Sequence, residues 1–104
     1  MVRTPIHPGK HLAEELRVLG MSTADLAREI DVPVHRVTGL IDGQTSITAD
    51  TALRLGHWFG IAPAFWMNLQ QLFELRRAEG EVGAEIAALP RLEDRSPPAP
   101  GSHV

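Results

Sequence analysis

The chain has 104 residues, a mass of 11.4 kDa and a formal net charge of −3. A chain of this mass buries roughly two-thirds of its surface on folding, which suffices for one small core but not for two domains. The absence of cysteine excludes disulfides and thiolate metal sites. The acidic balance excludes a histone-like protein that binds nucleic acid through a broad cationic surface, although a few local donors can still contact DNA.

Neither a targeting segment nor a membrane span is expected. The first ten residues contain no apolar run, which argues against a signal peptide. The most apolar stretch, residues 52–69, is interrupted by Gly60 and Pro63, so two short helices are favoured over one membrane span. We therefore expect a soluble, cytoplasmic protein.

Helical spacing of apolar residues predicts an all-α fold of five helices with a flexible C-terminal tail. The expected helices cover residues 8–19, 23–30, 34–42, 49–59 and 63–79, and a weak sixth helix is possible over 81–89. Residues 1–7 are expected to be a flexible lead-in, residues 8–80 the folded domain, and the proline-rich residues 90–104 disordered. The residues expected to face the core from the first four helices are Leu12, Leu16, Leu19, Leu26, Ala27, Ile30, Val37, Leu40, Ile41, Ala52, Leu55 and Phe59.

The segment 24–43, ADLAREIDVPVHRVTGLIDG, carries the most information about function. Small Ala27 lets two helices approach closely, Asp31 tolerates the left-handed conformation of a tight turn, and Val32 fills the corner between the helices. This pattern is typical of a helix-turn-helix. Its second helix would fit the major groove, with its N-terminal residues nearest the base edges.

The residues expected to contact DNA lie on that second helix and directly after it. The outward positions on the helix are Val34, His35, Thr38 and Gly39. The expected phosphate contacts are Arg36, Gln44, Thr45, Ser46 and the N–H groups at the start of the preceding helix, from Thr23 onward. Apolar spacing alone also fits a hairpin that only packs. Because residues 24–43 hold two arginines against four acidic residues, a single copy would bind DNA weakly and a dimer would be needed.

Several ordered motifs cover about three-quarters of the chain. They are HPG at 7–9, VPxxRV at 32–37, ITADTALRL at 47–55, WFG at 58–60, PxFWMNLQ at 63–70 and FEL at 73–75. On these motifs, residues 6–80 resemble the HigA family of antitoxins, or VapI-type addiction-module antidotes, in the phage-repressor-like helix-turn-helix superfamily. The resemblance implies a homodimer that binds an operator palindrome, represses its own operon and neutralises a HigB-type mRNA-cleaving toxin. Gly39 departs from the pattern, because family members often carry a longer polar residue there.

The fifth helix holds more large apolar residues than one core-facing side requires. The expected dimer interface comprises Phe65, Trp66, Leu69, Leu72 and Phe73. The alternative is that all five belong to the internal core. No catalytic constellation is present and no cofactor is expected. His7 and His11 lack a third metal ligand, so no metal site is expected. Two other functions stay open: a solitary helix-turn-helix regulator without a toxin, and a helical adaptor that binds protein.

Overall fold

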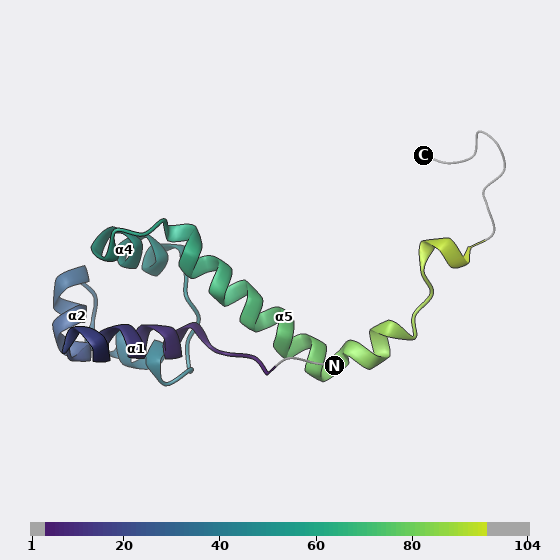
Figure 1. Cartoon of the computed structure of the whole chain (residues 1–104), viewed down its shortest axis with the longest axis horizontal. Coiled ribbons are helices and arrows are strands. Elements are labelled where there is room, and N and C mark those ends of the chain that lie inside the picture. Colours follow the sequence, from purple (N-terminus) through teal and green to yellow (C-terminus); the bar gives the residue numbers. More distant parts are fainter. Residues whose placement is uncertain (1–3, 96–104) are drawn as a thin grey trace.

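The computed structural model describes residues 4–95, and the regular secondary structure in this part of the chain is all helical (Figure 1). Its elements are α1 (Pro8–Leu19), α2 (Thr23–Ile30), α3 (Val34–Ile41), α4 (Ala49–Phe59), α5 (Pro63–Ala87) and a 3-10 turn, η1 (Leu92–Asp94). The all-α prediction is therefore confirmed. Residues 1–3 of the expected flexible lead-in and residues 96–104 of the expected disordered tail lie outside the described residues. Within residues 4–95, no helix combines the length and apolar character needed to cross a bilayer.

The helix boundaries follow from capping residues that the sequence displays. Ser22 and Asp25 form a capping box at the start of α2, and the Thr48 hydroxyl accepts the Thr51 N–H at the start of α4. Gly20 and Gly60 end α1 and α4 in the left-handed conformation. These residues account for where α1, α2 and α4 begin or end.

The predicted lead-in is too long, because its last residue is part of the folded structure. His7 is the N-cap of α1, and its Nδ1 accepts the Gly9 N–H at 2.9 Å. Its ring also packs edge-on against Phe73 of α5, with the ring centroids 4.9 Å apart. Histidine is not among the usual capping residues, so the sequence gives little sign of this role.

The helix-turn-helix geometry matches the prediction. Asp31 ends α2 with a φ of 56°, Ala27 is buried where α2 packs on α3, and Val32 is half-buried at the corner. At the back of α3, Gly9 of α1 lies against the Leu40 carbonyl with no space for a Cβ atom. The backbone of α1 at Gly9 therefore contacts the backbone of α3 at Leu40 directly, with no side chain between them.

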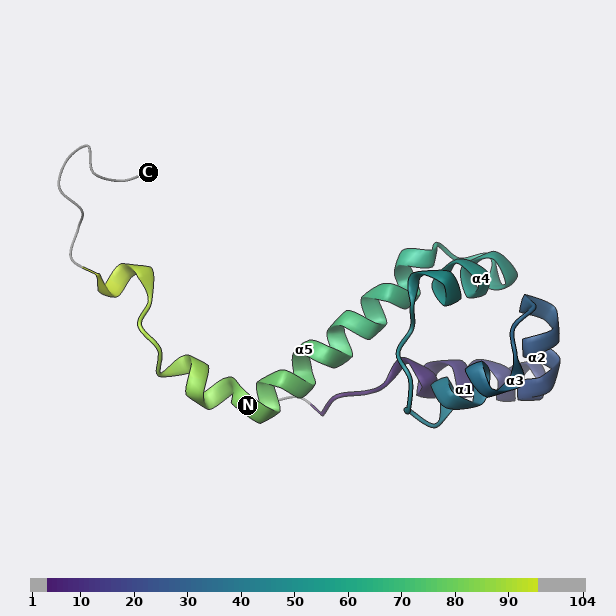
Figure 2. The same ribbon diagram turned by 180° about the vertical axis from the view of Figure 1, so that it is seen from behind.

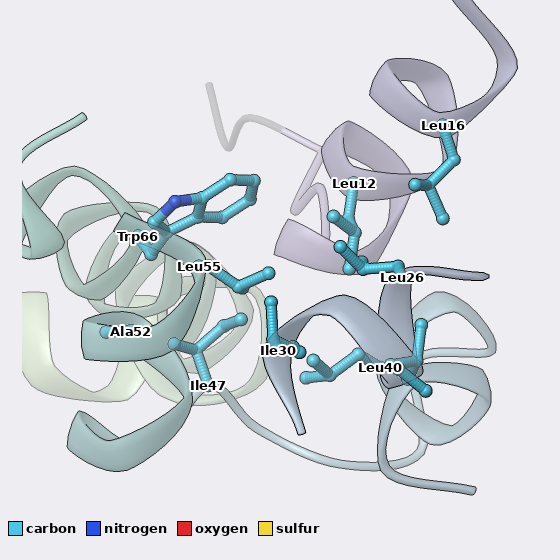
Figure 3. Close-up of a cluster of buried hydrophobic side chains, with 11 residues drawn as sticks. Leu12, Leu16, Leu26, Ile30, Leu40, Ile47, Ala52, Leu55 and Trp66 are labelled. Carbon is cyan, nitrogen blue, oxygen red and sulfur yellow. The ribbon is translucent and has the colours of Figure 1, made fainter. Parts of the chain in front are cut away.

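A single core lies between α1–α4 and the first half of α5 (Figure 3). Its buried residues are Leu12, Leu16, Leu26, Ala27, Ile30, Val37, Leu40, Ile47, Ala52, Leu55 and Trp66. Leu19, expected to face inward, is the last residue of α1 and is instead 49% exposed. Ile41 and Phe59 pack at the edge of the core and are half-buried.

The fifth helix is longer than expected. It runs without a break for 25 residues, so the predicted end at residue 79 and the separate helix over 81–89 are both wrong. Gly80 suggests a stop, but one glycine inside a helix costs only about 1 kcal/mol relative to alanine. The second half of α5 lies away from α1–α4 in both opposite views (Figures 1 and 2).

Candidate nucleic-acid interface

The first turn of α3 is the exposed part of the helix-turn-helix. Val34 is 45% exposed and His35 is also exposed, so these two of the four predicted outward positions are accessible. Thr38, one turn further on, is half-buried, and its hydroxyl donates to the His35 carbonyl at 3.3 Å. Val34 offers a methyl surface and His35 a ring that can donate or accept, which are side chains suited to the major groove.

Gly39 does not lie on this exposed surface, and the prediction that it faces outward is wrong. It is buried because the chain after α3 folds back over it: the N–H groups of Gln44 and Thr45 donate to its carbonyl at 2.9 and 3.2 Å. A Cβ atom at position 39 would lie 3.2 Å from the Thr45 hydroxyl. The glycine therefore makes room for the loop over residues 43–46 rather than for DNA.

A shallow groove of about 500 Å³ brings four of the predicted residues together, between α3, the following loop and α4. Its lining residues are Asp31, His35, Arg36, Thr45, Ser46, Thr48, Asp50, Thr51 and Arg54. His35, Arg36, Thr45 and Ser46 thus share one surface, as predicted. Val34, Gln44 and Thr23 do not line this groove, although Gln44 is exposed on the loop beside it.

Arg36 belongs to an ion-pair cluster that was not predicted from the sequence. Asp50 Oδ2 accepts hydrogen bonds from Arg36 Nη1 at 2.8 Å and from Arg54 Nε at 3.0 Å. The hydrogen bond from Arg54, followed by the charges of both guanidinium groups, holds the pKa of the Asp50 carboxyl below its usual value. A phosphate that binds Arg36 must therefore share this guanidinium group with Asp50. The spacing of Asp50 and Arg54, four residues apart on one helix, is the available sequence signal.

Arg54 also ties α4 to the turn of the helix-turn-helix. Its Nη1 donates to the carbonyls of Ile30 and Asp31, at 2.8 and 3.1 Å, where α2 ends. These carbonyls have no partner within their own helix, so the guanidinium group satisfies them and places positive charge at the helix C-terminus. Arg54 therefore fixes the turn that orients α3.

The start of α2 is a weaker phosphate site than predicted. Its capping box already uses the N–H groups of Ser22 and Asp25, and it places a carboxylate at the helix N-terminus. The hydrogen bonds from Ser22, followed by the hydrogen bond from Arg28, lower the pKa of the Asp25 carboxyl, so a carboxylate paired with Arg28 already occupies the position that a phosphate would take. Thr23, the predicted contact, is half-buried beside it.

The predicted dimer interface divides into two kinds of residue. Trp66 is completely buried among the core helices, so its assignment to an exposed interface is wrong. The other four residues reach the surface: Leu72 is 42% exposed, and Phe65, Leu69 and Phe73 are half-buried. Of the five predicted residues, these four can contact a second copy.

Within residues 4–95, no group of three histidine or acidic side chains is placed to hold a metal ion. His7 uses its Nδ1 to cap α1, and His11 lies 3.8 Å from Glu15 with its ring packed against Phe65 and Trp66. Both rings therefore have structural neighbours that account for their positions.

The chain is similar to known proteins in both sequence and structure, although no family model matches it. Virulence-associated protein I of Dichelobacter nodosus is 43% identical over 90 residues, which are 86% of this chain and 83% of that protein. The structure of an addiction module antidote protein of a HigA family from Coxiella burnetii is 44% identical, with a TM-score of 0.80 over 91% of this chain and 99% of that one. The Pseudomonas aeruginosa antitoxin HigA, solved with the higBA promoter, is 39% identical, with a TM-score of 0.80 over 85% of this chain and 98% of that one.

Proposed function

The chain belongs to the HigA family of helix-turn-helix antitoxins, a family of DNA-binding regulators and not of enzymes, and we propose that it represses its own operon as an operator-bound dimer. The observation that carries this proposal is the exposed first turn of α3, next to a groove that gathers His35, Arg36, Thr45 and Ser46. A projecting helix start flanked by donors is what a major groove and its phosphates accept.

The proposed contacts differ in kind. Val34 and His35 contact base edges, while Arg36, Gln44, Thr45 and Ser46 contact phosphates. Because Asp31 and Asp50 line the same groove, one copy has little net positive charge to offer the duplex. Two copies on a palindrome double the number of donors, so dimerisation is part of the DNA-binding mechanism.

The proposed dimer interface uses the exposed apolar residues in the first half of α5. Leu69, Leu72 and Phe73 line one side of a groove opposite Ile6 and Pro8, and His7, His11 and Arg76 line the rest of it. Phe65 lies outside this groove and is half-buried. Leu72→Glu is expected to yield folded monomers with weakened operator binding, measured by light scattering and gel shift. If the Leu72→Glu variant stays dimeric, this surface is not part of the dimer interface.

The second part of the proposed function is neutralisation of a toxin. We propose that the partner is a HigB-type mRNA-cleaving ribonuclease, encoded beside this chain, as the family membership implies. If the purified protein fails to bind the product of the neighbouring reading frame, the chain is a solitary regulator instead.

Operator binding can be tested by gel shift with the DNA upstream of the chain's own gene. Arg36→Ala is expected to weaken binding and to lower the salt slope by about 1, because one phosphate contact is lost. His35→Ala is expected to weaken binding and relax sequence preference. Arg91→Ala is the matched control, since this arginine also faces a carboxylate, Glu93 at 3.6 Å, but lies beyond α5. Binding unaffected by the changes at positions 35 and 36 would contradict the proposed interface.

A further inference from the structure

The chain between α3 and α4 is held at two points by hydrogen bonds to different helices. In the loop over residues 43–46, two N–H groups donate to the Gly39 carbonyl of α3, at 2.9 and 3.2 Å. Just after the loop, the Ile47 N–H donates to Oε1 of Gln70 in α5, at 2.8 Å. Ser46 lies between these two anchors, so its position depends on both helices.

The anchor on α5 is buried and has a defined orientation. Ile47 and Gln70 are both 3% exposed, and the Ile47 side chain belongs to the core cluster drawn in Figure 3. The Gln70 Nε2 atom lies 3.5 Å from Oε2 of Glu74. Because an ionised carboxylate only accepts hydrogen bonds, it fixes the NH₂ end of the amide, and the oxygen end points toward Ile47. Without this oxygen, the Ile47 N–H would be buried and unpaired.

Ser46 is the residue of the loop whose backbone donor is left over. The other three residues of the loop over 43–46 donate their N–H groups to carbonyls of α3. Within residues 4–95, the Ser46 N–H has no such partner. Ser46 is exposed and lines the same groove as Arg36. A backbone N–H and a serine hydroxyl are both common donors to DNA phosphates, so Ser46 offers two donors at one position.

The helix that holds this loop also carries the proposed dimer surface. Gln70 directly follows Leu69 and precedes Leu72 and Phe73, which line the groove on α5. In the proposed dimer, both protomers contact one duplex at the same time. The loop of each protomer must therefore be fixed relative to the helix that joins the protomers. The hydrogen bond from Ile47 to Gln70 makes this connection.

We propose that Gln70 is a positioning residue for operator binding. It holds the Ile47 N–H so that the N–H and the hydroxyl of the neighbouring Ser46 reach one phosphate. Gln70 is buried and does not touch DNA, so its effect on operator affinity passes through the loop. The inference rests on the proposed function, because it concerns the operator contacts of the proposed dimer.

The test is a double-mutant cycle on operator affinity. It uses the DNA upstream of the chain's own gene, at a temperature where circular dichroism shows every variant fully folded. Gln70→Leu is expected to weaken binding about tenfold, because donors to a charged phosphate are misplaced. Ser46→Ala is expected to weaken binding by about 3- to 10-fold in the wild-type chain, but not further in the Gln70→Leu chain, because the two changes affect one contact. The salt slope should stay at its wild-type value, since neutral donors release no counterions.

A second pair of changes restores the acceptor. Gln70→Glu keeps an oxygen opposite the Ile47 N–H, and combining it with Glu74→Gln keeps the net charge and reverses the hydrogen bond between positions 70 and 74. This double variant is expected to bind the operator within about threefold of the wild type. Gln71→Leu is the matched control, because it makes the same substitution at an exposed neighbour in the same helix. If Gln70→Leu does not fold, Gln70→Met, which keeps the length of the side chain, takes its place in the cycle.

The outcomes separate the inference from the proposed function. Weakened binding by a dimeric Gln70→Leu, no further loss from Ser46→Ala, and recovery in the exchanged pair support the inference. If Gln70→Leu binds the operator like the wild type, the inference alone is overturned. It is also overturned if the two changes act independently, if the salt slope falls, or if Gln70→Leu is monomeric, since Gln70 then supports the whole fold or the dimer. A wild-type chain that does not bind the operator refutes the proposed function and the inference with it.

Discussion

Replacement of Gly9 by alanine should destabilise the fold, although helix propensity alone predicts the opposite. Gly9 lies in the first turn of α1, where it packs against the end of α3. An added Cβ atom would lie 2.6 Å from the carbonyl carbon of Leu40 and 3.0 Å from the Cα of Ile41, and closer still to the Leu40 carbonyl oxygen. All three neighbours are backbone atoms, so no side-chain rotation can relieve the overlap.

The magnitude follows from this geometry. Non-bonded carbon atoms prefer separations of about 3.5–4.0 Å, so α1 and α3 would have to move apart by roughly 1 Å. Overpacking of this kind typically costs about 1–3 kcal/mol, and rigid neighbours favour the upper end of that range. The gain in helix propensity offsets at most about 1 kcal/mol, which leaves a net loss of about 2 kcal/mol. For a domain of this size the melting temperature would fall by roughly 10 °C.

The assay is thermal and urea unfolding at one fixed protein concentration, because the proposed dimerisation would make the midpoint depend on concentration. Gly83→Ala is the matched control: it lies within α5, and its Cβ would have only Glu79 Cβ, at 3.8 Å, as a neighbour. This control should gain up to about 1 kcal/mol. The reasoning is refuted if Gly9→Ala is as stable as the wild type or is stabilised like the control.

Three further outcomes are expected. Gln70→Leu should lower the free energy of unfolding by about 1–3 kcal/mol, measured in urea, because the buried Ile47 N–H loses the Oε1 atom it donates to at 2.8 Å. A lowered pKa at Asp50 stabilises the folded state above its usual value of 3.8, and this contribution is lost as the pH falls through the folded-state pKa. In the Asp50→Asn variant, the urea midpoint should therefore fall less between neutral and acidic pH than it does in the wild type. This difference should be larger in low salt than in high salt. The same variant should tighten operator binding in gel shifts, since Arg36 is released and a nearby negative charge is removed; weaker binding would mean that Asp50 mainly positions Arg36.

Local sequence signals predict most of the fold. The caps at Ser22 and Thr48, the stops at Gly20 and Gly60 and the tight turn at Asp31 each depend on a few neighbouring residues, so they can be identified in the sequence. The end of α5 is predicted wrongly for a related reason. A single glycine resembles a stop, although its cost is too small to end a helix without a competing cap.

The errors in the site arise from contacts between distant segments. Gly39 is buried only because the loop over residues 43–46 folds back on α3, and its place on the helix does not reveal this. Trp66 is buried because several helices surround it. The number of apolar residues on α5 could not show which of them lie in the core and which lie at the surface. The link from Arg54 to the Ile30 carbonyl spans 24 residues and has no local pattern.

The absence of a side chain at Gly9 has a mechanical consequence for the proposed DNA complex. At the contact between Gly9 and Leu40 the two backbones touch directly, so no flexible side chain between α1 and α3 can yield there when α3 is displaced. In the proposed complex each protomer then holds its DNA-contacting helix, α3, at a fixed angle. The protein cannot adjust to an operator whose two half-sites are wrongly spaced. The duplex has to bend or twist to meet it, so base steps that no side chain touches would contribute to the choice of site.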